Sequence, residues 1–215
     1  MLDIGIGLGR TTLHFAPLVK EYVGIDYSFN MVKTYQKIFP KQKTNTQVRL
    51  GDARMMQEFE TDSFDFILFS YNGIDYVSQE DRIQALEEIK RVGKKGGYFA
   101  FSTHNLQCIN NLYSIKINSS LKGFVYQCYK YLRLIYENGL PGKYRNMDFT
   151  IINDGASRFK LTTYYIKPAA QIEQLQDLGF KKIRLFSLKT GEEIKKIGLD
   201  KITQDSWIYF LCEFP

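Results

Sequence analysis

The chain opens on a short apolar strand that runs directly into a glycine-rich turn, Asp3-Ile-Gly-Ile-Gly-Leu-Gly9. A strand that passes through glycines into a helix lets backbone amides approach a ligand closely, because no Cβ atom stands in the way. Apolar strands and helical segments then alternate over the first hundred residues. Such alternation is typical of parallel strands joined by right-handed helical crossovers. We therefore expect a doubly wound α/β fold, with helices on both faces of one sheet.

Apolar runs and capping residues set the expected limits of these elements. Ser28 and Ser78 are suited to cap helix N-termini, and Asp81 completes a capping box with Ser78. Gly93 stands where a helix C-terminus favours a left-handed residue. Strands are expected at residues 1–4, 22–26, 47–50, 64–70 and 98–103, and helices at 10–19, 29–38 and 79–92, with Pro17 bending the first helix.

The alternation stops after residue 103. Residues 105–138 have a helical pattern, and two strands are expected at 147–153 and 158–166. The earlier pattern then resumes with a helix at 168–178 and strands at 180–188 and 207–214. No internal repeat or flexible linker divides the sequence. We therefore expect residues 1–215 to form a single domain, with residues 105–160 inserted into it as a lid.

Three carboxylates end three successive strands. Asp3 precedes the glycines, Asp26 ends the second strand, and Asp52 follows Gly51 at the end of the third. Open α/β sheets bind ligands at this edge, where Asp26 could accept hydrogen bonds from ribose hydroxyls and Asp52 from the amine of adenine. The spacing GxGxG differs from the dinucleotide fingerprint GxGxxG, and Asp3 would repel a pyrophosphate. The glycine spacing and the position of Asp3 therefore favour a sulfonium nucleoside bearing an amino acid as the ligand. The alternative is that the protein is an NAD(P)-dependent oxidoreductase.

These motifs resemble, in order and spacing, those of the class I S-adenosylmethionine-dependent methyltransferases. The resemblance rests on LDIGIGLGR, VGIDYSFNM, GDA, FDFILFSYNGIDYV, LEEIKRVGKKGGYFAFS and QLQDLGF, and it covers nearly all of the chain outside residues 105–160. It implies a Rossmann-like seven-stranded sheet of order 3-2-1-4-5-7-6 with the last strand antiparallel. It also implies S-adenosylmethionine as the cofactor, with S-adenosylhomocysteine as the product, held by Asp3, Gly5, Gly7, Gly9, Asp26, Tyr27, Met31, Asp52, Ala53 and Ser70.

The chain departs from that family at its start. Members normally have a full first strand and at least one helix before the glycine turn, whereas Met1 and Leu2 alone precede Asp3 here. We therefore expect the N-terminal helix and the start of the first strand to be missing, which would open the pocket to water. Weak cofactor binding or low activity of this chain would follow. A calorimetric dissociation constant in the low micromolar range or tighter would contradict that expectation.

The methyl acceptor is less constrained than the cofactor. Tyr71 and His104 follow the fourth and fifth strands, beside the expected methyl group, and they are the candidate catalytic residues. His104 has the side chain whose ordinary pKa suits proton removal near neutral pH, although it could equally be a histidine hydrogen-bonded within a loop. The basic, aromatic insertion suits a lid over a small-molecule acceptor, and an RNA or protein acceptor is the alternative. A degenerate methyltransferase fold that serves as a scaffold is the non-enzymatic alternative.

Composition excludes several other classes of protein. Two histidines and three scattered cysteines form no metal-ligand cluster, and the cysteines form neither a CxxC pair nor a disulfide framework. A reducing cytoplasm is therefore the expected location. No apolar run reaches the ~18 residues that span a bilayer, so no membrane partner is expected. The net charge of +6 is spread along the chain, which makes a nucleic-acid partner less favoured than a small molecule.

Overall fold

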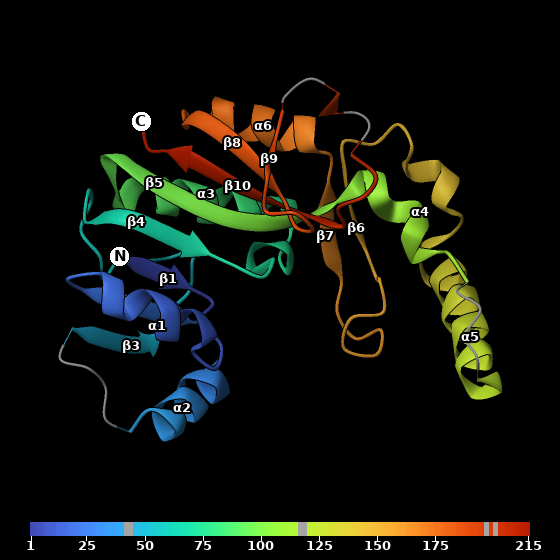
Figure 1. Ribbon diagram of the computed structural model, residues 1–215, viewed down its shortest axis with the longest axis horizontal. Coiled ribbons are helices and arrows are strands. Elements are labelled where there is room, and N and C mark those ends of the chain that lie inside the picture. The colour runs from blue at the N-terminus through green and yellow to red at the C-terminus, as the bar shows by residue number, and fades with distance from the viewer. Residues whose placement is uncertain (41–44, 116–119, 196–197, 200–201) are drawn as a thin grey trace.

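The computed structural model describes residues 1–40, 45–115, 120–195, 198–199 and 202–215. Its centre is a twisted sheet in which the hydrogen-bonded order is β3-β2-β1-β4-β5-β10-β8-β9 (Figure 1). These strands are β1 (Leu2–Ile4), β2 (Tyr22–Asp26), β3 (Thr46–Leu50), β4 (Phe64–Phe69), β5 (Gly93–Asn105), β8 (Lys181–Ser187), β9 (Glu193–Ile194) and β10 (Trp207–Glu213).

The strand order confirms the expected topology. The first five strands pair in parallel, and β10 runs antiparallel to both of its neighbours, β5 and β8. With β8 as the sixth strand and β10 as the seventh, the order is 3-2-1-4-5-7-6. The short β9, which forms a hairpin with β8, was not predicted. A strand of two residues is too short to show the alternation of apolar and polar side chains by which strands are predicted.

Helices cover both faces of the sheet. They are α1 (Arg10–Phe15), α2 (Phe29–Ile38), α3 (Gln79–Val92) and α6 (Pro168–Asp177), with α4 (Ile109–Leu112) and α5 (Leu121–Asn138) in the insertion. The main core packs α3 and α6 against one face, where Phe99 and Phe210 lie at its centre. A smaller core on the other face holds Ala16 and Tyr22 beneath the first helix. This arrangement confirms the doubly wound architecture.

The helix ends follow their capping chemistry, with two exceptions. Ser28 and Ser78 accept hydrogen bonds from backbone amides in the first turns of α2 and α3, as predicted. The first helix is shorter than predicted, because the chain tightens into a 3-10 turn around Pro17. The expectation of a left-handed Gly93 was wrong: its φ is −78°, and it begins β5 directly. Gly93 lies against the ring of Phe214, which leaves no room for a Cβ atom, and the left-handed residue is Gly96.

The insertion has a core of its own. It contains α4, α5, a 3-10 turn (Pro141–Tyr144) and β6 (Phe149–Ile152), and its core includes Leu134, Tyr144 and Tyr165. The pattern predicted helix throughout residues 105–138, but the helical segments are interrupted. The strand predicted at 158–166 begins later, as β7 (Thr163–Ile166), because residues 157–159 have positive φ values and form a turn.

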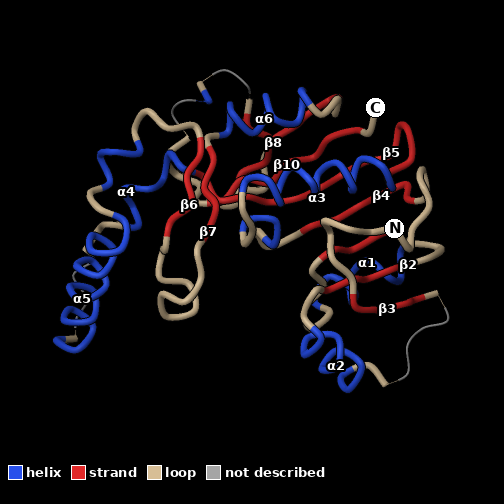
Figure 2. The backbone as a smooth tube through the Cα atoms, turned by 180° about the vertical axis from the view of Figure 1, so that it is seen from behind, coloured by secondary structure: helices blue, strands red, loops and turns tan. Residues whose placement is uncertain are grey.

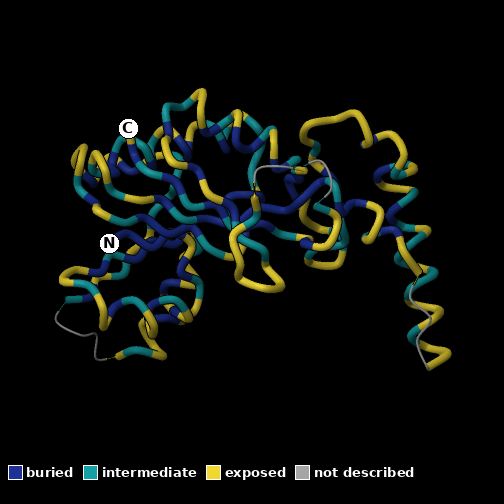
Figure 3. The backbone as a smooth tube through the Cα atoms, turned by 45° about the horizontal axis from the view of Figure 1, so that its top comes forward, coloured by how far each residue is buried: buried dark blue, intermediate teal, exposed yellow. Residues whose placement is uncertain are grey.

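Strand β7 joins the insertion to the sheet. It pairs antiparallel with β6 and in parallel with the end of β5, where His104 is level with Tyr165 (Figure 2). Buried residues follow the sheet, whereas α5 is largely exposed or half-buried (Figure 3). Among the described residues, no helix combines the length and hydropathy that a bilayer crossing requires.

Candidate active site

A pocket of about 690 Å³ opens at the carboxyl ends of β1 to β4. Ile74 and Tyr76 after β4, Ile151 of the insertion and Leu161 just after it complete its walls. The volume lies within the range of about 300–1,000 Å³ that is usual for small-molecule sites. Seven of the predicted cofactor residues line this pocket: Gly5, Gly7, Asp26, Tyr27, Met31, Asp52 and Ala53. Asp3, Gly9 and Ser70 do not line it.

The glycines of the turn differ in what surrounds them. All three are left-handed, with φ values of +70° at Gly5, +52° at Gly7 and +84° at Gly9. A Cβ atom on Gly9 would lie 2.5 Å from the ring of Tyr35, so this glycine allows α2 to pack on the turn. A Cβ atom on Gly7 would meet nothing within 4 Å. Gly7 therefore leaves open the space beside the pocket that a ligand could occupy.

Asp26 ties the glycine turn to the end of β2. Its Oδ2 accepts a hydrogen bond of 2.8 Å from the backbone amide of Gly7, and its Oδ1 accepts one of 2.9 Å from Ser28. Each carboxylate oxygen has a further lone pair, so both could also accept hydrogen bonds from a diol. Asp26 therefore positions the turn and presents acceptor atoms to the pocket at the same time.

Asp52 forms an ion pair with Arg54 in the wall of the pocket. Arg54 Nη2 lies 2.6 Å from Asp52 Oδ2, and its Nη1 lies 2.9 Å from Asp81. The hydrogen bonds from Arg54 lower the pKa of Asp52 below its ordinary value, so the carboxylate stays ionised near neutral pH. A ligand amine would share this carboxylate with Arg54. Arg54 and Asp81 were not predicted as site residues, because no motif marked Arg54 and the capping box explained Asp81 as part of a helix start.

Asp3 lies beneath the glycine turn and is fully buried. It accepts hydrogen bonds from the hydroxyls of Thr11 and Tyr22, and its Oδ1 has no partner among the described residues. Burial raises the pKa of Asp3 from 3.8 to about 6, because desolvation disfavours the ionised form. Its role near a ligand ammonium group stays a prediction, and the same holds for Ser70 at the end of β4.

The residues after β4 adopt an unusual backbone. Tyr71 and Asn72 both have a φ of +55°, which is rare for residues other than glycine and is found at functional sites. The guanidinium of Arg10 lies 3.3 Å from the centre of the Tyr71 ring, and the edge of Trp207 packs on the same residue. Tyr71 is half-exposed and lies outside the pocket wall. Its catalytic role stays a prediction.

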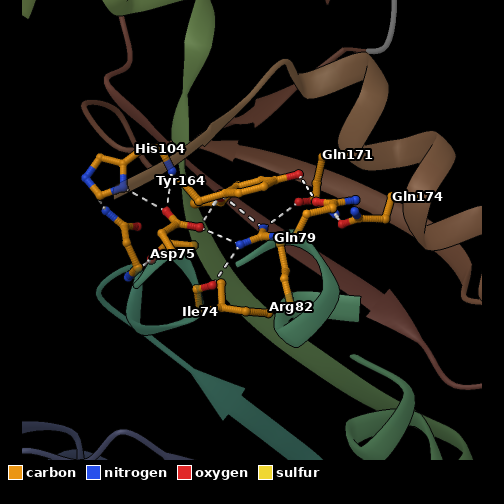
Figure 4. A network of polar contacts seen from close by, with 11 residues as sticks. Ile74, Asp75, Gln79, Arg82, His104, Tyr164, Gln171 and Gln174 are labelled. Carbon is orange, nitrogen blue, oxygen red and sulfur yellow. Dashed lines mark hydrogen bonds and ion pairs between the residues drawn. The ribbon is translucent and has the colours of Figure 1, made fainter. Parts of the chain in front are cut away.

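His104 is held by a buried carboxylate that sequence analysis did not identify. Its Nδ1 lies 2.7 Å from Asp75 Oδ2, which also accepts a hydrogen bond of 2.8 Å from the His104 backbone amide (Figure 4). Because a carboxylate accepts at Nδ1, the neutral ring carries its proton there and keeps a lone pair on Nε2. The amide nitrogen of Asn72 lies 3.3 Å from that Nε2 atom.

Arg82 supplies the counter-charge to Asp75. Its Nη1 lies 2.6 Å from Asp75 Oδ1 and 3.0 Å from the carbonyl oxygen of Ile74, and both charged side chains have no exposed surface. Its Nη2 donates to Gln171 of α6 at 2.7 Å (Figure 4). One feature of the sequence could have revealed this buried ion pair. Arg82 lies on the apolar face of α3, where Ala85, Leu86 and Ile89 follow it. An arginine there requires a buried partner.

Residues 1–97 match a family model described as a methyltransferase domain. An uncharacterized methyltransferase, YcgJ, of Bacillus subtilis is 35% identical to this chain over 106 residues. That alignment covers 48% of this chain and 40% of the Bacillus protein. The chain therefore aligns with only about two fifths of the length of this relative.

Solved structures show the same fold over the whole chain. An S-adenosylmethionine-dependent methyltransferase from Clostridium acetobutylicum has a TM-score of 0.65 at 15% identity, covering 99% of this chain and 82% of that one. A putative S-adenosylmethionine-dependent methyltransferase from Listeria monocytogenes also has a TM-score of 0.65 at 16% identity, covering 100% of this chain and 90% of that one. The motifs and the match of residues 1–97 identify a methyltransferase domain in this part of the chain, and the strand order of the whole sheet is that of the class I S-adenosylmethionine-dependent methyltransferase fold.

Proposed function

We propose that the protein transfers the methyl group of S-adenosylmethionine to a small-molecule acceptor and that His104 removes a proton from this acceptor. The proposal rests on one observation above all. A single pocket is walled by the glycine turn and Asp26 on the sheet side and, on the other, by Ile151 of the insertion and Leu161 just after it. This arrangement suits a cofactor and a second small molecule that lie side by side.

The residues of the sheet side fit the cofactor. The open space beside Gly7 suits the methionine end, the acceptor oxygens of Asp26 suit the ribose, and Asp52 suits the amine of adenine. Tyr27, Met31 and Ala53 would flank the ribose and base, while Asp3, Gly5, Gly9 and Ser70 would support the methionine end. Once bound, the cofactor supplies an electrophilic methyl group, so the protein mainly has to align an acceptor and exclude water.

His104 is buried and does not itself line the pocket, but it is the group suited to general base catalysis on the acceptor side. His104 is oriented by Asp75, which keeps the lone pair of the neutral ring on Nε2. A neutral imidazole is the commonest general base in enzymes that act near neutral pH. An acceptor whose nucleophilic atom carries a proton, such as a hydroxyl group or a protonated amine, would need such a base. Tyr71 lies after the neighbouring strand and would border the same acceptor.

The charge of the pocket favours a small acceptor over RNA. Among the described residues that line the pocket, Arg54 is the one basic side chain, and it is paired with Asp52 and Asp81. An RNA site needs several unpaired basic groups that contact phosphates. If RNA were nevertheless the acceptor, binding would weaken steeply with added salt, and a flat salt response would remove that alternative.

Two measurements test the proposal. Thermal shifts recorded with S-adenosylhomocysteine, NAD and NADP side by side should show stabilisation by the first ligand alone, because a ligand that binds the folded state raises its stability. Methyl transfer from labelled cofactor into a metabolite extract should then label a small molecule, and His104→Gln should slow this transfer by about 10²- to 10⁴-fold. Stabilisation without any transfer would instead support a scaffold role, and stabilisation by NAD or NADP would refute the proposal.

A further inference from the structure

Helix α5 carries an exposed apolar stripe made of Leu121, Val125, Tyr129, Leu132 and Tyr136. These residues follow one another at intervals of 4, 4, 3 and 4 positions, which places them on one narrow face of the helix. All five are exposed, and Leu121 and Tyr136 are each 80% accessible to solvent. A continuous exposed apolar surface of this kind usually marks an interaction site.

The opposite face of α5 is already occupied. Leu134 is buried in the core of the insertion, and Tyr131 and Ile135 pack against that core. Figures 1 and 2 show that α5 projects from the body of the molecule next to α4, away from the sheet. The insertion therefore holds α5 by one side and presents the stripe on the other.

We propose that the stripe is an interface between two copies of this chain, which pair their α5 helices antiparallel about a two-fold axis near residues 128–129. The spacing of the stripe is self-complementary about that point. Leu121 would lie opposite Tyr136 of the partner subunit, and Val125 opposite Leu132 of the partner subunit. Two-fold contacts of this kind are reciprocal, so each pairing occurs twice.

The charges beside the stripe fit the antiparallel arrangement. Lys122 and Glu137 lie on the same flank of the stripe, one near each end of α5, and both are exposed. In an antiparallel pair, Lys122 would approach Glu137 of the partner subunit at both ends. A parallel pair would instead leave Lys122 and Glu137 at opposite ends of the seam, where they could not meet. Arg133 pairs with Glu137 within the same helix at 2.6 Å, and a carboxylate can accept hydrogen bonds from both cations.

The area of the stripe suits a dimer that dissociates on dilution. A large side chain covers roughly 150–200 Å², so five partly exposed ones would bury about 600 Å² in each copy. The total of about 1,200 Å² lies at the lower limit of specific interfaces. The narrow band of apolar side chains also suits a helix–helix seam, for which a strip one or two residues wide is sufficient.

Sedimentation velocity over a range of concentrations tests the proposal. The wild-type protein should show a monomer–dimer equilibrium, and Leu132→Glu should raise the dimer dissociation constant by at least about a hundredfold, since each dimer would bury two unpaired charges. Leu18→Glu is the matched control, because Leu18 is equally exposed but lies on the 3-10 turn after α1. It should leave the dissociation constant unchanged, and circular dichroism should show both variants folded.

A charge exchange tests the antiparallel orientation. Lys122→Glu and Glu137→Lys should each raise the dissociation constant about tenfold, because each places like charges together at both ends of the interface. The double variant should return to within about threefold of the wild type. A short bis-maleimide should also link two copies through Cys128, which lies next to the proposed axis and is half-buried, whereas Cys108 and Cys212 are buried. Cys128→Ser should abolish this linkage.

Several results would overturn the proposal. A protein that stays monomeric at every concentration would do so. So would a double variant that dissociates as readily as either single variant. A monomer that binds phosphatidylglycerol vesicles, and loses this binding in Leu132→Glu, would show that the stripe contacts a lipid surface instead of a second copy.

Discussion

Replacing Asp75 by asparagine would keep the size of this side chain and remove the charge that faces Arg82 and His104. In the folded protein the Asp75 carboxylate accepts hydrogen bonds from Arg82, from the Thr103 hydroxyl and from both the backbone amide and the ring of His104. Arg82 would remain charged in a site with no exposed surface. The substitution therefore leaves a buried cation without its counter-ion.

The expected cost follows from this burial. Removing one member of a buried ion pair usually costs about 3–5 kcal/mol, and the asparagine oxygen should retain part of one hydrogen bond. We therefore expect the free energy of unfolding to fall by about 3 kcal/mol for Asp75→Asn. At roughly 2–4 °C per kcal/mol for a chain of this size, the midpoint of thermal unfolding should fall by about 6–12 °C. Urea denaturation and scanning calorimetry at pH 7 measure both quantities.

A second variant separates the lost charge from a general loss of packing. Asp75→Leu combined with Arg82→Met removes both charges, and apolar replacement of a buried pair is often close to neutral. The double variant should therefore be more stable than Asp75→Asn. A loss below about 1 kcal/mol for Asp75→Asn, or a double variant no more stable than the single one, would refute the reasoning. The chain has only two histidines, so nitrogen NMR can also follow the tautomer of His104, which Asp75→Asn should shift towards Nε2–H.

Three further predictions concern the sheet side of the pocket. Gly9→Ala should lower the free energy of unfolding by about 2 kcal/mol, because its Cβ atom would meet the ring of Tyr35 at a left-handed position. Gly7→Ala should lower the free energy of unfolding by only about 1 kcal/mol, but it should weaken S-adenosylhomocysteine binding about tenfold in calorimetry. Asp26→Ala should weaken the same ligand about a hundredfold, and an unchanged affinity would exclude Asp26 from the site. The pKa of Asp3 is about 6 when folded and near 3.8 when unfolded, so the folded state binds more protons between these values. Stability should therefore fall by about 2 kcal/mol as pH rises from 4 to 7, and Asp3→Asn should remove that fall in urea titrations.

The sheet and its ligand edge were predictable because they rest on local patterns. Apolar runs of four to seven residues marked the strands, and Ser28 and Ser78 marked helix starts that the structure reproduces. The glycine spacing and the strand-end carboxylates Asp26 and Asp52 indicated where the pocket would lie, whereas Asp3 lies within β1, buried beneath the glycine turn. Each of these signals is contained in a short stretch of sequence, so no knowledge of distant contacts was needed.

The buried polar network was not predictable in the same way. Asp75 and His104 are 29 residues apart, and Arg82 and Gln171 are 89 residues apart, so only the folded chain brings them together. The interruption of the helical segment predicted at 105–138 was not predictable either. The pattern of tyrosines and lysines there permits a helix throughout, whereas in the structure Tyr113 after α4 is buried in the core of the insertion.

The proposed acceptor site combines two parts of the molecule that can vary separately. The turn Gly73–Asp75 supplies Asp75, which holds His104, and α3 supplies Arg82, which pairs with Asp75. The segment that leaves the insertion supplies Leu161 to the pocket and, from β7, the Tyr165 ring at 4.8 Å from the His104 ring. Changes in the insertion should therefore alter which acceptor fits while cofactor binding on the sheet side is retained. Changes in Asp75 or Arg82 should instead affect stability and the proton position on His104 whatever the acceptor is, because neither side chain lines the pocket and Asp75 holds the His104 ring.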